Sequence, residues 1–86
     1  MQIIFEPDAR ADLDFFIKSG NKTILKKIAK LVEAIGENPF EGLGKPEPLK
    51  YELAGTWSRR INQQHRLIYE VLGNKIIIHS LKGHYD

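Results

Sequence analysis

Residues 66–81, RLIYEVLGNKIIIHSL, contain two runs of β-branched and aromatic residues on either side of the dipeptide Gly73-Asn74. A glycine-asparagine pair between two such runs is typical of a two-residue β-hairpin turn. In the first run, apolar residues at 67, 69 and 71 would share one face of a strand, and residues 66, 68 and 70 the other. The preceding segment 57–63 is also strand-like, and Gln64-His65 forms a close connection to the hairpin. We therefore expect a β meander in the C-terminal half.

The N-terminal half has a different periodicity. Residues 3–5, Ile-Ile-Phe, are predicted as a first strand, and Pro7 between two acidic residues favours the start of a helix. Apolar residues of that helix fall on one stripe, at Ala9, Leu13, Phe16 and Ile17, and Gly20 is a plausible stop.

A second helix is expected after Gly20. Asn21 can cap it, and apolar residues at 24, 28, 31, 32 and 35 follow helical spacing opposite a lysine stripe. Gly36 and the Asn38-Pro39 pair end the pattern. The next stretch, 38–49, contains three prolines and two glycines, which excludes regular helix and central strand. Long ordered loops of this kind often carry function.

Together these segments predict an α+β fold, with an N-terminal strand and two helices packed on an antiparallel β-sheet. A chain of 86 residues, 42% hydrophobic and 28% charged, suits one compact domain, 1–86. It has no cysteine, which excludes disulfides and thiolate metal sites. No apolar run approaches the roughly 20 residues of a membrane span, and the first residues lack signal-peptide character. We expect a cytoplasmic protein without a membrane partner.

Charge is unevenly distributed along the chain. Residues 44–86 carry seven basic and four acidic side chains, a net charge of +3, and all three histidines. Residues 59–66 gather polar groups in and between two predicted strands, namely Arg59, Arg60, Asn62, Gln63, Gln64, His65 and Arg66. One interpretation is a solvated sheet face that resists aggregation. The other is a concave basic surface that binds a phosphate backbone.

The histidines leave similar alternatives. His84 lies near the C-terminus, where it is either part of a frayed tail or held in place by the last strand. His65 suits a turn, and His79 suits a half-buried position in the sheet. No histidine pair has the helical spacing of a zinc site, and the acidic residues form no cage. We predict no metal and no cofactor.

Several motifs together resemble the YoeB (Txe) family of toxins in the RelE superfamily. They are Pro39-Phe40-Glu41-Gly42, the segment 44–50 (GKPEPLK), 57–61 (WSRRI), 65–69 (HRLIY) and the terminal His84-Tyr85. The similarity extends from the second helix to Tyr85, and the combination is more specific than any single piece. The resemblance implies a microbial-RNase-like fold and an endoribonuclease that cleaves mRNA on the ribosome, in contact with ribosomal RNA. It also implies a YefM-type antitoxin and a homodimer.

Mapped residue by residue, the resemblance implies a general base at Glu47, the principal phosphate-binding arginine at Arg66 and a general acid at His84. Three further positions match supporting substrate contacts, namely Lys50, Arg60 and Tyr85. Two departures concern Gln64, where the family often has an acidic residue, and Asp86, which extends the chain beyond the tyrosine.

These residue types match what metal-free RNA cleavage requires: a base for the 2′-hydroxyl, positive charge at phosphorus and an acid for the departing 5′-oxygen. The alternative from another class is a non-catalytic module that binds the ribosome, RNA or an antitoxin and blocks translation without cleavage.

Overall fold

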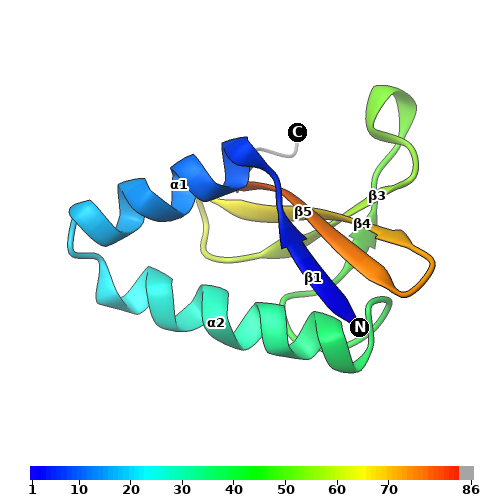
Figure 1. The fold of residues 1–86 in the computed structure, drawn as a ribbon, viewed down its shortest axis with the longest axis horizontal. Helices are drawn as coiled ribbons and strands as arrows, with labels where there is room; N and C mark the ends of the chain where they lie inside the picture. The colour runs from blue at the N-terminus through cyan, green and yellow to red at the C-terminus, as the bar shows by residue number, and fades with distance from the viewer. Residues whose placement is uncertain (84–86) are drawn as a thin grey trace.

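The computed structural model describes residues 1–83, in which two helices follow a first strand and precede the rest of the sheet (Figure 1). The elements are β1 (Gln2–Phe5), α1 (Pro7–Lys18), α2 (Lys22–Glu37), β2 (Glu47–Pro48), the short 3-10 helix η1 (Tyr51–Leu53), β3 (Thr56–Arg60), β4 (Arg66–Leu72) and β5 (Lys75–Gly83). The α+β arrangement predicted from the sequence is confirmed.

The five strands form one sheet in the order β1-β5-β4-β3-β2. Strands β2 to β5 pair antiparallel, as expected. Strand β1 pairs with β5 in parallel, so the sheet is mixed. Parallel neighbours need a long crossover rather than a hairpin, and the two helices lie in the chain between β1 and the remaining strands.

Helix boundaries follow the sequence signals. Pro7 occupies the first turn of α1, and the Asn21 side chain accepts a hydrogen bond from the Ile24 amide at 3.1 Å. Gly20 adopts a left-handed φ of 70° between the two helices. The prediction that Ile17 belongs to the apolar stripe of this helix is wrong, because its side chain is 54% exposed while Ala9 and Phe16 are buried.

Both helices and one face of the sheet share a single hydrophobic core. From α2 it takes Ile24, Ile28, Leu31 and Ile35, and from the sheet Leu67, Tyr69, Ile76, Ile78 and Leu81. The predicted alternation in β4 is therefore confirmed, because Leu67 and Tyr69 face the helices. No helix of residues 1–83 covers the opposite face of the sheet, so polar side chains can gather on that face.

One predicted strand is too long. The segment 57–63 leaves the sheet at Arg60, because the Asn62 side-chain oxygen accepts hydrogen bonds from the amides of Gln64 and His65, at 2.9 and 2.7 Å. This local turn competes with the strand ladder. The Gly73-Asn74 turn is as predicted, since Leu72 pairs with Lys75 and Gly73 has a φ of 60°. Neither helix of the described part is long and apolar enough to cross a membrane.

Candidate active site

The register of three strands brings three of the predicted site residues onto one face. Glu47 in β2 pairs with Ser58 in β3, and Arg60 in β3 pairs with Arg66 in β4. Directly paired residues of antiparallel strands point to the same face, as do residues two apart in one strand. Glu47, Arg60 and Arg66 therefore share the face away from the helices. Glu47 and Arg60 are exposed there, and Arg66 is half-buried.

Arg59, the neighbour of Arg60, points the other way and is fully buried. Its Nε donates to the Tyr69 hydroxyl at 3.2 Å and its Nη1 to the Leu43 carbonyl at 3.0 Å. Its Nη2 donates to the carbonyls of Glu41, at 3.0 Å, and Asn38. These contacts fasten the proline- and glycine-rich loop onto the sheet.

The buried position of Arg59 corrects the view of residues 59–66 as one exposed basic surface. Arg59 pairs with Leu67 and lies on the core face. An isolated buried charge is costly, and multiple hydrogen bonds offset that cost. Strand alternation puts Arg59 on the same face as the apolar residues Trp57 and Ile61, and this pattern was the available sequence signal for its burial. We did not predict that burial, because a basic residue at a core position is rare.

Tyr69, in β4, also binds the proline- and glycine-rich loop, and together Arg59 and Tyr69 form a clamp that holds this loop on the sheet. Its hydroxyl donates a hydrogen bond to the Pro39 carbonyl and accepts one from Arg59. Burial raises the pKa of Tyr69 above its ordinary value of 10.0, and the hydrogen bond and charge of Arg59 oppose that rise. The hydroxyl therefore keeps its proton over the physiological range and remains a donor to the loop.

Gly44 closes the same loop against α2. Its φ is +87°, and a Cβ built there would lie 2.7 Å from Leu31 Cδ2 and 3.1 Å from Arg59 Cβ. Its carbonyl accepts the Arg60 amide at 2.7 Å. The loop is thus tied to β3 three residues before Glu47, which fixes where the edge strand β2 begins.

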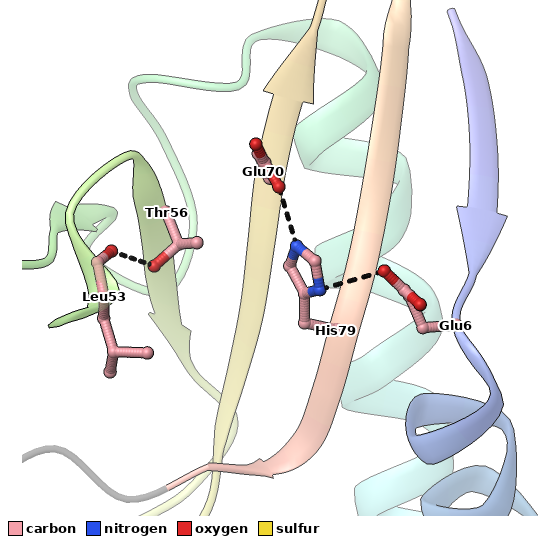
Figure 2. Close-up of polar contacts among 5 residues, drawn as sticks. All are labelled: Glu6, Leu53, Thr56, Glu70 and His79. Carbon is pink, nitrogen blue, oxygen red and sulfur yellow. Dashed lines mark hydrogen bonds and ion pairs between the residues drawn. The ribbon is translucent and has the colours of Figure 1, made fainter.

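Lys50 is exposed at the other end of β2, where it begins the turn containing η1. The preceding Leu49 is buried, and its amide donates to the Thr56 carbonyl at 2.9 Å. Thr56 Oγ1 in turn donates to the Leu53 carbonyl at 2.6 Å, as Figure 2 shows. Lys50 is therefore connected to Glu47 by a short segment that is hydrogen-bonded to β3.

Two smaller features complete the face. The Ser58 hydroxyl is buried opposite Glu47 and has no hydrogen-bond partner among residues 1–83. Gly83, at the end of β5, pairs with Arg66, and a Cβ at Gly83 would lie 2.6 Å from Ile68 Cγ1. This strand end passes too close to β4 for a side chain.

His84 and Tyr85, predicted as the acid and a substrate contact, lie outside the described residues.

The other histidines have structural surroundings. Figure 2 shows His79 between two carboxylates, with Nε2 2.9 Å from Glu70 Oε1 and Nδ1 3.2 Å from Glu6 Oε1. His79 is half-buried, as predicted, and links β5 to β4 and to the start of α1. His65 is in a turn, also as predicted, and its ring meets Phe16 edge-on with centroids 5.2 Å apart. Within residues 1–83 no three histidine, aspartate or glutamate side chains converge as a metal site would require.

Comparison with known proteins places this arrangement in a family. Residues 5–85 match the family model described as YoeB-like toxin of bacterial type II toxin-antitoxin system. The chain belongs to this family. Toxin YoeB of Synechocystis is 45% identical over 86 residues, covering 100% of this chain and 99% of the relative. The sequence resemblance to YoeB toxins is thereby confirmed.

Solved structures agree with the YoeB assignment. The YoeB/ParE toxin from Agrobacterium tumefaciens has a TM-score of 0.93 and 36% identity, with 99% of this chain and 100% of that chain covered. A YoeB dimer and a heterotetrameric YoeB-YefM complex from Staphylococcus aureus have TM-scores of 0.89 and 0.87, each 46% identical and covering 99% of this chain and 98% of theirs. YafQ from Escherichia coli, at 16% identity over 96% of this chain and 92% of that chain, shares the fold with a TM-score of 0.80.

Proposed function

We propose that this YoeB-family chain is a ribosome-dependent endoribonuclease that cleaves mRNA by metal-free acid-base chemistry. The observation that carries the proposal is the strand register, which puts a carboxylate, Glu47, on the same sheet face as two guanidinium groups, Arg60 and Arg66. The first step of RNA cleavage requires a base for the 2′-hydroxyl proton and positive charge at phosphorus, and both kinds of group lie on this face.

In that step Glu47 takes the proton of a 2′-hydroxyl, and the oxygen attacks the adjacent phosphorus. Arg66, supported by Lys50 and Arg60, stabilises the additional negative charge. His84 then gives a proton to the departing 5′-oxygen, and Tyr85 supports the bound RNA. The products are a 2′,3′-cyclic phosphate and a free 5′-hydroxyl. Base, charge and acid all come from side chains, so the scheme calls for no metal or cofactor.

Dependence on the ribosome follows from alignment. The face is an open strand surface with an exposed base, so it does little by itself to hold a flexible message in line for attack. Correct alignment of reacting groups is a large and separate source of rate. The ribosome and its RNA would supply that alignment by holding the message in the decoding site.

The products distinguish this enzyme from a module that only blocks translation. Purified protein, either untreated or stripped of metal by EDTA and then dialysed, is added to ribosomes programmed with a defined message in ordinary magnesium buffer. The new ends are mapped by primer extension and cyclic-phosphate-specific ligation. We expect 2′,3′-cyclic phosphate ends at equal rates in both samples. Arrested translation with an intact message would favour the non-catalytic alternative. Loss of cleavage by the stripped protein, restored by adding back a transition metal, would contradict metal independence.

We further propose a YefM-like antitoxin and a homodimer as partners of this chain, in the cytoplasm. Support comes from the Staphylococcus aureus relatives, whose structures are a YoeB dimer and a YoeB-YefM complex. Size-exclusion chromatography with light scattering, on the chain alone and co-expressed with a YefM-type protein, tests both partners. A monomer throughout, with no co-elution, would contradict them.

A further inference from the structure

Tyr51 is presented to solvent more completely than any other large apolar side chain in the described part of the chain. It is 92% exposed, whereas the other exposed large hydrophobic residues of that part range from 42 to 57%. Its ring therefore makes little contribution to the core. An aromatic side chain held in solvent is a feature that the fold itself does not require.

The backbone of Tyr51 is also unfavourable. Its φ is +58°, in the left-handed region that glycine and asparagine occupy at lower cost than a tyrosine. The turn around Tyr51 is nevertheless hydrogen-bonded: the Leu53 amide donates to the Lys50 carbonyl at 3.1 Å, and the Ala54 amide to the Tyr51 carbonyl at 3.0 Å. Strain that persists in a well-bonded turn points to a use for the residue that causes it.

The turn is placed beside the candidate active site. Tyr51 lies four residues after Glu47, and the intervening Leu49 is buried, so the turn has a fixed base. Figure 1 shows the turn with η1, at the upper right, projecting beyond the sheet and away from both helices. An RNA strand bound along the face of Glu47 and Arg66 would extend past such a projection.

We infer that Tyr51 is a stacking platform for an unpaired nucleobase of the RNA that crosses this face, with Lys50 contacting a neighbouring phosphate. The inference rests on the proposed function for the identity of the ligand. A flat ring that is 92% exposed suits stacking, which tolerates any base because every base has an aromatic face. Its chain neighbours, Lys50 and Glu52, are charged and exposed, which makes the turn unlike the apolar centre of a protein interface.

Substitutions at Tyr51 distinguish the contribution of its aromatic ring to RNA binding from the effect of the turn's backbone conformation. All are made on a Glu47→Gln background, so that the message stays intact, and affinity for message-programmed ribosomes is measured. Tyr51→Gly removes the ring and also relieves the left-handed strain, so its melting temperature should not fall. We expect Tyr51→Gly and Tyr51→Ala to weaken binding about 10- to 100-fold. Tyr51→Phe and Tyr51→Trp keep a stacking face and should stay within about twofold of the parent.

Leu72→Ala is the matched control, because Leu72 is also exposed, at 52%, and lies at the far end of β4. It should leave binding unchanged. Unaltered affinity in Tyr51→Gly, or failure of Phe and Trp to preserve affinity, would overturn the inference. Tyr51→Gly that binds ribosomes normally but loses a YefM-type antitoxin would also overturn it, by assigning the ring to a protein interface.

The outcomes separate this inference from the proposed function. Normal ribosome binding by Tyr51→Gly, together with cleavage of the message by the wild-type chain, would refute the stacking platform alone. A wild-type chain that leaves the message intact, together with a Tyr51 series that behaves as expected, would refute catalysis and keep the platform.

Discussion

Arg59 and Arg60 are adjacent in the chain and lie on opposite faces of β3. Arg59 is buried and binds three loop carbonyls, whereas Arg60 is exposed on the face of Glu47 and Arg66. The sequence predicted polar residues here without separating these two roles. Alternation within the strand decides the difference, and that alternation could be assigned only once Trp57 was known to face the helices.

Substitution of each arginine by alanine should therefore have different consequences. Arg59→Ala leaves several buried acceptors without a donor, so we expect a loss of at least about 3 kcal/mol in the free energy of unfolding. Arg60→Ala should change stability by no more than about 0.5 kcal/mol, as is usual for exposed positions, while reducing cleavage. Urea unfolding followed by circular dichroism measures the first effect. Equal destabilisation by both changes would contradict the clamp.

The buried hydroxyl of Tyr69 predicts a dependence on alkaline pH. Burial raises its pKa in the folded chain above the ordinary value of 10.0, so the unfolded chain loses this proton first. The hydroxyl's stabilising contribution is then complete below pH 10 and is lost as the pH rises through the folded pKa. The stability difference between wild type and Tyr69→Phe should be constant below pH 10 and should shrink as the pH rises above 10. A difference that grows over that range would contradict the assignment.

At the scale of elements, the loop at 38–49 shows what a sequence pattern can and cannot predict. Its prolines and glycines correctly excluded regular helix and central strand. They did not indicate the two-residue edge strand β2, which exists because Glu47 and Pro48 pair with β3. That pairing depends on the contacts of Arg59, Tyr69 and Gly44 with distant parts of the chain, which no local pattern encodes.

Two glycines of similar backbone conformation test how closely the loop packs. Gly44 and Gly55 have φ values of +87° and +95°, but only Gly44 has atoms where a Cβ would go. Alanine at Gly55 should cost about 1 kcal/mol of strain. Alanine at Gly44 adds a collision with Leu31 and should cost about 1–3 kcal/mol more. Chemical denaturation of both variants gives the comparison, and equal losses would mean that the loop can move away from α2.

At the scale of the molecule, one face of the sheet stabilises the fold and the opposite face carries the candidate site. One face packs on both helices and forms the core, and the other carries Glu47, Arg60 and Arg66. The sequence predicted the layers and most element ends because hydrophobic periodicity and turn residues are local signals. It could not predict the parallel pairing of β1 or the common face of the site residues, since each depends on strand register. Strand alternation placed Arg59 on the same face as Trp57 and Ile61, but the burial of that face was assigned only from the structure. The roles of Glu47, Arg66 and His84 stay predictions.

The central claim is that Glu47 acts as the base on this face, and Glu47→Gln tests it most directly. The substitution keeps the side chain's size, removes the carboxylate and touches an exposed position that contributes little to folding. Single-turnover cleavage on message-programmed ribosomes should fall by about 10²–10⁴-fold, while ribosome affinity stays within about twofold of wild type. Cleavage that persists near the wild-type rate, or that falls only in proportion to lost binding, would contradict the account.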